Sequence, residues 1–287
     1  MYLDGHIHSL EYAGDGKEKQ SRLLADMAKA GISGGLLISV DPLTYPEIGY
    51  KDRIRAILEQ TEGQENLFPF FWINPLDEDA VEQVDYAASV GIDGIKIINS
   101  YTYPSDPRVM AIARRAAELD KPVLFHSGIL WDGRESAKFN RPGEFECLLE
   151  IPKLRFMLAH VSWPWCDECI AVLGKFDNAK TLRPDLSCEM FVDVTPGTPT
   201  VYREEVFRKL FFSDYDVRYN VVFGTDCNTE HYNIPWVQKW MDCDNDIYTR
   251  YGLASPDFFD HIYGKNLLRF LGKSDEVIEK KLPVMGV

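Results

Sequence analysis

Two histidines separated by a single residue lie at the start of the chain. His6 and His8 end an apolar run, residues 2–8, whose composition predicts a β-strand. Alternate side chains of a strand share one face, so the two imidazoles are expected on the same side, about 6.6 Å apart along the strand. Two ligands of one metal ion can bridge that separation. The alternative is an incidental pair on an exposed strand, because a motif match is only a hypothesis until its context is known.

Further groups that could bind a metal or carry protons follow other apolar runs. His126, His160 and Asp226 each end a predicted strand, and Lys96 lies inside one. Taken singly, each has an ordinary explanation: a hydrogen-bonded interior histidine, an aspartate that caps a helix, or a lysine that extends to solvent. A charged lysine among apolar residues is nevertheless costly unless it is paired or modified. Their joint occurrence with the first two histidines favours a metal-centred site.

The elements that must position these groups alternate regularly along the chain. Apolar runs rich in β-branched and aromatic residues predict strands at residues 2–8, 35–40, 68–73, 94–98, 123–126, 155–160, 190–194 and 221–226. Amphipathic stretches predict helices at residues 17–30, 52–61, 78–90, 106–119, 143–149, 165–176 and 200–212. Three more helical segments, residues 234–241, 257–262 and 267–271, are expected to wrap or close the fold.

Strands that alternate with helices predict a parallel sheet, and eight such units predict a closed barrel. We therefore expect an α/β protein, a (β/α)8 TIM barrel with extra C-terminal helices, that forms one domain over residues 1–287. An open doubly wound sheet is the alternative, but neither of the phosphate-loop patterns GxGxxG and GxxxxGKS/T occurs. Active sites of TIM barrels lie at the carboxyl ends of the strands, which is where the candidate residues fall.

The composition is typical of a folded protein that acts on small molecules. Hydrophobic residues make up 45% of the 287 positions and aromatic residues 13%, which excludes global disorder. A net charge of −14 argues against nucleic-acid and anionic membrane partners. With no secretory leader and no apolar run near about 20 residues, we expect a cytoplasmic protein that does not span a membrane. Cys166 and Cys169 have CxxC spacing, but a helix carrying two buried thiols explains them better than a zinc or redox site.

The order and spacing of these motifs resemble the amidohydrolase superfamily, and within it the amidohydrolase-related (amidohydrolase 2) group. The resemblance covers nearly the whole chain. It rests on DGHIH from residue 4, GIK from 94, PVLFHSG from 122, AH from 159, FGTD from 223 and IYGKNLLRF from 262. These motifs are specific for the superfamily and carry no information about the substrate.

The resemblance implies a ligand set and a cofactor. His6, His8, His126 and Asp226 would bind one divalent metal ion, with zinc the expected ion. His160 would lie beside the open coordination position. In two-metal relatives the lysine equivalent to Lys96 is carboxylated and bridges both ions, and we favour one ion over two. The resemblance also suggests a homodimer.

The same resemblance implies an activity. A metal-activated water would cleave an amide, lactone or ester bond in a small substrate, which could carry a carboxylate group. Asp226 would take the proton of the water, and His160 would donate a hydrogen bond to the developing oxyanion. The first alternative is a metal-dependent, non-oxidative decarboxylase of an aromatic or unsaturated carboxylic acid, since it uses the same ligands. The second is a catalytically silent metal-binding barrel.

Substrate specificity is expected in the loops that follow the strands. Arg134 and Arg141 belong to a locally basic stretch after the fifth predicted strand and could bind a substrate carboxylate. Trp163 could wall a pocket, and His231 could touch the substrate. Ordinary solvated loop charges and packing under a loop are the alternatives.

Overall fold

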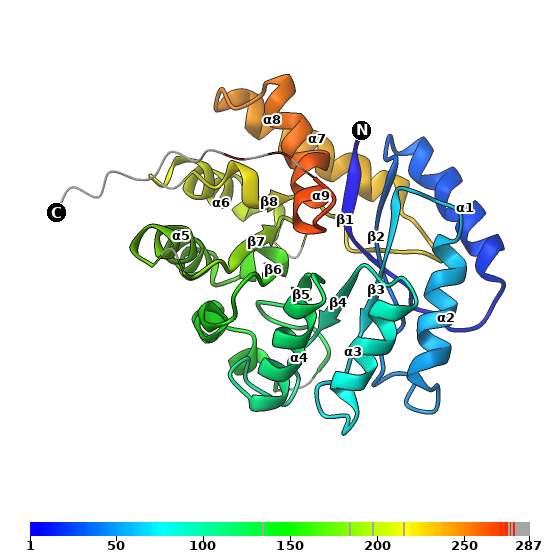
Figure 1. The fold of residues 1–287 in the computed structure, drawn as a ribbon. Coiled ribbons are helices and arrows are strands. Elements are labelled where there is room, and N and C mark those ends of the chain that lie inside the picture. Colours follow the sequence, from blue (N-terminus) through cyan, green and yellow to red (C-terminus); the bar gives the residue numbers. More distant parts are fainter. Residues whose placement is uncertain are drawn as a thin grey trace.

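The computed structural model describes residues 1–133, 135–183, 185–196, 198–214, 216–274, 276 and 278. Within these ranges the chain forms a curled sheet of nine parallel strands (Figure 1). The strands are β1 (Leu3–His8), β2 (Gly34–Ile38), β3 (Leu67–Trp72), β4 (Gly94–Ile97), β5 (Val123–Phe125), β6 (Arg155–Leu158), β7 (Glu189–Asp193), β8 (Val221–Val222) and β9 (Cys227–Asn228).

The sheet closes on itself between its first and last strands. The strand order is β8-β7-β6-β5-β4-β3-β2-β1-β9, and β9 pairs with β1 through Ile7 opposite Cys227 and His8 opposite Asn228. The eighth predicted strand, residues 221–226, is shortened to β8, which pairs with β7, and β9 follows directly after the predicted segment and pairs with β1. This arrangement confirms the TIM-barrel fold predicted from the sequence.

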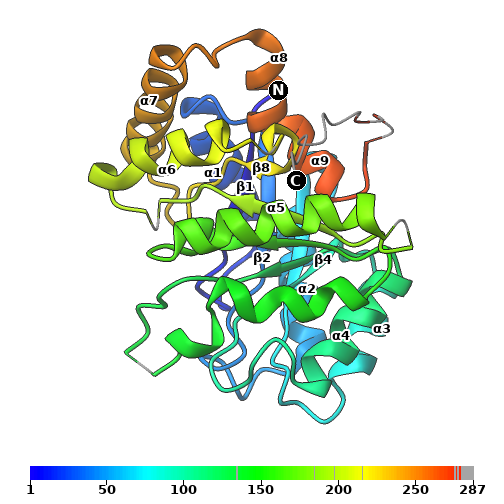
Figure 2. The same cartoon turned by 90° about the vertical axis from the view of Figure 1, so that its left-hand side faces the viewer.

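Helices lie around the outside of the sheet in both views (Figures 1 and 2). Their order is α1 (Gly16–Lys29), α2 (Tyr50–Thr61), α3 (Ala80–Ser89), α4 (Pro107–Glu118), α5 (Cys166–Leu182), α6 (Thr200–Phe212), α7 (Ile234–Arg250), α8 (Pro256–Asp260) and α9 (Asn266–Phe270). In α4 the buried residues recur at helical spacing, Val109, Ile112, Ala113 and Ala116, so one face of the helix packs on the strands. None of the described helices is long and apolar enough to cross a membrane.

The crossover from β5 to β6 differs from the prediction. The segment expected to be an α-helix, residues 143–149, is the 3₁₀ helix η2 (Pro142–Glu150). Gly143 is a poor helix former, so the start of this short segment gives an α-helix little support. The N–H of Gly143 donates instead to the Glu168 carboxylate of α5, at 3.0 Å.

Two apolar layers hold the barrel together. Side chains that point into the barrel, among them Leu36, Phe70 and Met157, form an interior cluster, and alternate residues on the same strands pack outward against the helices. α9 adds Leu267 and Phe270 to the interior cluster. α9 therefore closes the barrel, as predicted, and it packs against β6 and β8.

Candidate metal centre

The imidazoles of His6 and His8 converge at the carboxyl end of β1. Their Nε2 atoms lie 3.1 Å apart, closer than the backbone spacing, because the two side chains turn toward each other. The Oδ1 atom of Asp226, between β8 and β9, lies 3.7 Å from His6 Nε2 and 3.5 Å from His8 Nε2. Among the described residues, these three form a compact group that could hold a metal ion, with donor atoms within 4.8 Å of one another.

Two glycines let β1 approach the segment that carries Asp226. A Cβ atom on Gly5 would lie 2.9 Å from the Phe223 carbonyl oxygen, and a Cβ atom on Gly224 would lie 3.0 Å from the Cβ of His6. Two backbone hydrogen bonds join the segments at this contact. Gly5 N donates to Phe223 O at 2.8 Å, and Asp226 N donates to His6 O at 3.0 Å. Larger side chains at either glycine would push the ligands apart.

A buried carboxylate, Asp4, stabilises the same contact between β1 and the segment that carries Asp226. It accepts hydrogen bonds from the Thr225 N–H at 3.0 Å, the Thr225 hydroxyl at 2.5 Å and the Tyr232 hydroxyl at 2.9 Å. Burial raises the pKa of Asp4 to about 6, because these neutral donors only partly offset its desolvation. Asp4 thus holds the residue immediately before Asp226 against β1.

His126 and His160 approach the same centre from β5 and β6. The ring centroids of His126 and His160 are 5.1 Å apart, and those of His6 and His160 are 5.4 Å apart. The buried Nε2 atom of His126 has no hydrogen-bond partner among the described residues. His160 is followed by Val161 and Ser162, and all three have positive φ angles of 62°, 44° and 53°. Such backbone is unfavourable for a β-branched valine, and strain of this kind concentrates at functional sites.

Lys96 is fully buried on β4 and points at the centre. Its Nζ atom lies 3.4 Å from His6 Nε2. Burial lowers the pKa of Lys96 to about 8, although the carboxylates of Asp193 and Asp226 act in the opposite direction. The lysine that lies among apolar residues in the sequence is therefore part of the candidate site.

Burial favours the neutral form of three histidines of the site, His8, His126 and His160. Burial lowers the pKa of His8 and His126 well below the usual value, and the positive charges of neighbouring imidazoles and of Lys96 add to the effect. Burial also lowers the pKa of His160. Neutral imidazole is the form that binds a metal ion.

The residues present fit a divalent ion. An unpartnered polar atom in the interior is costly, and metal binding would satisfy the Nε2 atom of His126. Three imidazole nitrogens and a carboxylate oxygen form a donor set that Zn²⁺ and related ions accept. His126 lies outside the compact group formed by His6, His8 and Asp226.

Two buried residues of this region were not singled out in the sequence. Asp193, at the end of β7, accepts a hydrogen bond from His6 Nδ1 at 2.9 Å and another from the His160 N–H at 2.8 Å. Thr195 lies between Asp193 and the His160 ring. Burial alone would raise the pKa of Asp193, but the adjacent His6 and His160 lower it below its usual value. A charged residue at the end of an apolar predicted strand was the available signal.

The structure describes only one of the two arginines that were predicted to bind a substrate. Arg134 lies outside the described residues. Arg141 donates to the Glu168 carboxylate at 2.8 Å, and its guanidinium lies 5.4 Å from the ring centroid of Trp165. The structure thus places Arg141 in an ion pair with α5, and its role toward a substrate stays a prediction.

Trp163 and His231 lie in the loops where they were expected. Trp163 is half-buried and its ring lies 6.3 Å from that of Tyr202. His231 is exposed, and its backbone N–H donates to the side chain of Asn228 at 2.7 Å. Neither contact places the side chain against the histidine cluster, so both substrate roles stay predictions.

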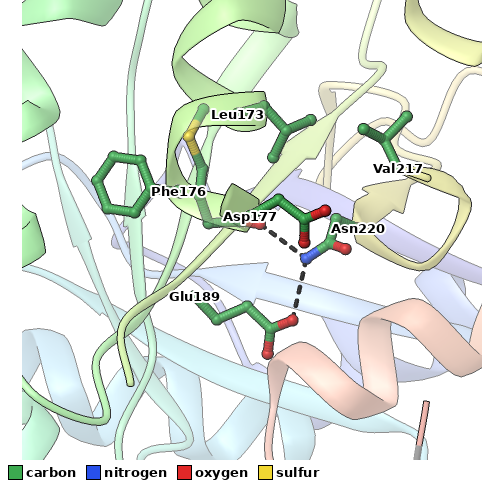
Figure 3. Close-up of a pocket in the computed structure, with 7 residues that line it drawn as sticks. Leu173, Phe176, Asp177, Glu189, Val217 and Asn220 are labelled. Carbon is green, nitrogen blue, oxygen red and sulfur yellow. Dashed lines mark hydrogen bonds between the residues drawn. The ribbon is translucent and has the colours of Figure 1, made fainter. Parts of the chain in front are cut away.

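Figure 3 shows a pocket whose lining residues include none of the candidate metal centre. It lies where β7 begins, and the amide of Asn220 donates there to the Glu189 carboxylate at 3.1 Å and to the Met190 carbonyl at 2.8 Å. Its volume of about 10 Å³ has room for about one water molecule. Because active sites of such barrels lie at the opposite end of the strands, this pocket is a packing feature.

The closed parallel barrel carries its cluster of histidines and carboxylates at the carboxyl ends of the strands. The protein is therefore a TIM barrel with a candidate metal site. The chain matches the family described as Amidohydrolase (Amidohydro_2) over residues 22–280. The chain therefore belongs to this amidohydrolase family. The match begins after His6 and His8, so their place in the site rests on the structure. No curated protein matches the chain by sequence.

Solved structures share the fold at low sequence identity. The 2,6-dihydroxybenzoate decarboxylase from Rhizobium is 15% identical with a TM-score of 0.61, over 94% of this chain and 98% of that chain. An amidohydrolase from Burkholderia multivorans is 10% identical with a TM-score of 0.62, over 95% and 99%. The dihydroorotase from Campylobacter jejuni is 16% identical with a TM-score of 0.57, over 98% and 85%. At these identities the likeness shows the fold alone.

Proposed function

We propose that this protein is a metal-dependent hydrolase that cleaves an amide, lactone or ester bond in a small molecule. The observation that carries the proposal is the convergence of His6 Nε2, His8 Nε2 and Asp226 Oδ1 at the carboxyl end of the barrel. The unpartnered Nε2 atom of His126 is the fourth proposed ligand. A bound divalent ion, zinc in this proposal, supplies Lewis acidity toward water or a substrate oxygen.

The chain supplies two groups that can hold or move a proton. The side chain of Asp226 is 41% exposed, so its carboxylate faces the barrel mouth as well as the two imidazoles. It is the proposed proton acceptor, and it later returns the proton to the leaving group. His160 is the second proposed catalytic residue, because its ring lies beside His6 and His126.

One ion is proposed rather than two. Lys96 contacts His6 Nε2 through its amine nitrogen, and a two-ion site would require this amine to be carboxylated. The imidazoles of His6, His8 and His126 and the Asp226 carboxylate would hold one ion without the Lys96 amine.

A decarboxylase is the second candidate function. The observation that favours it is the similarity to the 2,6-dihydroxybenzoate decarboxylase fold, which spans 94% of this chain and 98% of that chain. The same ligand set serves both reactions, so the substrate must distinguish them. A small aromatic acid would be the substrate in this alternative.

Metal content and turnover, measured with Asp226→Asn, test the proposal. The purified protein should contain about one equivalent of a divalent ion. It should hydrolyse members of a panel of lactones, esters and amides, whereas release of carbon dioxide from aromatic acids would establish the alternative. Asp226→Asn should stay folded and lose turnover, because the amide cannot accept the proton.

The matched control is Asp242→Asn, since Asp242 is an exposed aspartate on α7. This variant should keep wild-type turnover. Full activity after removal of the metal by a chelator would overturn the mechanism. Unfolding on metal removal, with no turnover of either panel by the metal-loaded protein, would instead establish a silent metal-binding barrel.

A further inference from the structure

The ring of His160 is held by a short chain of hydrogen bonds that starts at Asp193. The Oδ1 atom of Asp193 accepts from two backbone N–H groups, those of His160 at 2.8 Å and Thr195 at 3.2 Å. The Thr195 hydroxyl oxygen lies 2.6 Å from the same Oδ1 and 2.5 Å from His160 Nδ1. All three residues are buried.

The direction of each hydrogen bond follows from the number of protons available. Backbone N–H groups can only donate, so Oδ1 of Asp193 is an acceptor whether or not the other oxygen carries a proton. The Thr195 hydroxyl must therefore donate its single proton to Oδ1. It has no second proton for His160, so Nδ1 of His160 must be the donor in that contact.

We infer that Thr195 is a positioning residue that fixes neutral His160 in the Nδ1–H tautomer, so that His160 meets the substrate as a proton acceptor at Nε2. The inference rests on the proposed function insofar as it concerns the substrate. It refines the role predicted from the sequence, in which His160 donates a hydrogen bond to the oxyanion. The neutral ring cannot donate from Nε2, and it gains that ability only after it has accepted a proton there.

The surroundings of Thr195 keep its hydroxyl in this orientation. Its methyl group packs against Gly224, where a Cβ atom would lie 2.6 Å from the Thr195 Cγ2. The buried guanidinium of Arg203 reaches the Thr195 carbonyl at 3.5 Å, and two hydrogen bonds of 2.7 and 2.6 Å join it to Asp244. Both the side chain and the backbone of Thr195 are therefore constrained.

The tautomer can be measured directly by long-range ¹H–¹⁵N NMR of histidine-labelled protein. The signals of His160 are assigned from their loss in His160→Gln. In the wild type, Nδ1 of His160 should carry the proton and Nε2 should show the shift of an unprotonated nitrogen. A His160 ring protonated at Nε2 in the neutral wild type would overturn the inference, and this result needs no variant of Thr195.

Thr195→Val and Thr195→Ser test the role of the hydroxyl. Valine has the same shape but no hydroxyl, so the His160 proton should move to Nε2 and kcat should fall by about 10- to 100-fold with little change in KM. Serine keeps the hydroxyl and should restore both the tautomer and most of the turnover. An unchanged tautomer in Thr195→Val would refute the role of Thr195.

Thr249→Val is the matched control, because the Thr249 hydroxyl is exposed on α7 and bonds only to the Asn245 carbonyl among the described residues. This variant should leave the His160 signals unchanged. The NMR readout does not depend on activity. A wild type that turns over no substrate would therefore refute the proposed function while the tautomer result decides the role of Thr195 separately.

Discussion

Two buried carboxylates accept hydrogen bonds from His6, and they differ in their other partners. Asp4, at the seam between β1 and the segment before β9, accepts hydrogen bonds from the His6 and Thr225 backbone and from two hydroxyl groups. Asp193, at the end of β7, also accepts from backbone N–H groups and a hydroxyl, but it additionally contacts the His6 ring.

This one difference reverses their acidity. Burial raises the pKa of Asp4 to about 6, because all its partners are neutral. Asp193 is equally buried, yet its pKa is lowered, because the His6 and His160 imidazoles stabilise its negative charge. The comparison shows that adjacent imidazoles, rather than the number of hydrogen bonds, decide the ionisation of a buried carboxylate here. Asp4 accordingly holds the backbone of His6 and Thr225 in place, whereas Asp193 orients the rings of His6 and His160.

The largest effect is expected from Asp193→Asn. The amide has a single oxygen, so it cannot accept from His6 Nδ1 and, at the same time, from the His160 backbone and the Thr195 hydroxyl, and one of the two rings loses its support. A loss of this kind costs about 10- to 100-fold in metal affinity or activity, so kcat and metal affinity should fall by about that factor. Steady-state kinetics and competition with a chromophoric chelator measure the two effects. Equal losses in Asp4→Asn would abolish the distinction between the two carboxylates.

A smaller effect, on stability, is expected from Asp4→Asn. Both oxygens of Asp4 accept hydrogen bonds, and asparagine replaces one of them by an NH₂ group, which can only donate. One buried donor would therefore lose its acceptor. The free energy of unfolding should fall by about 1–3 kcal/mol, as measured by urea denaturation. The exposed variant Asp242→Asn should show no change. A loss of metal affinity larger than the loss of stability would place Asp4 among the residues that orient the ligands.

The last effect concerns the pH dependence of stability. Asp4 is protonated in the folded protein up to about pH 6 but ionises near pH 4 when unfolded, so its contribution to stability is present below pH 4 and is lost as the pH rises through 6. The lowered pKa of His8, His126 and His160 acts oppositely, because the unfolded chain takes up protons below about pH 6.5.

Removal of the Asp4 carboxyl group should therefore make the acid loss of stability steeper. Between about pH 4 and 6, Asp4→Asn should lose up to about 1.4 kcal/mol more per pH unit than the wild type. Urea denaturation across this range, with a chelator present to exclude metal effects, measures the slopes. Parallel slopes would show that Asp4 is ionised in the folded protein.

The barrel itself was predictable because its signal is local. Each of the eight apolar runs contains a strand, although only Val221–Val222 of residues 221–226 is one, because a run of β-branched and aromatic residues is itself typical of a buried strand. The segment 143–149 was wrong as an α-helix, because its 3₁₀ geometry depends on contacts with α5 that its own sequence does not report. Asp193 and Thr195 were missed for a similar reason: their partners lie 187 and 35 positions away.

The sequence alone determined the alternation of strands and helices, and hence that the side chains of His6, His126, His160 and Asp226 fall at one end of a barrel. Periodicity and strand ends are properties of short segments, which a sequence displays directly. Only the tertiary structure decided that Asp226 meets His6 and His8, and that Asp193 joins His6 to the His160 backbone. Those contacts depend on closure of the ring between β9 and β1 and on the directions of individual side chains. Neither is encoded in any one segment of the chain.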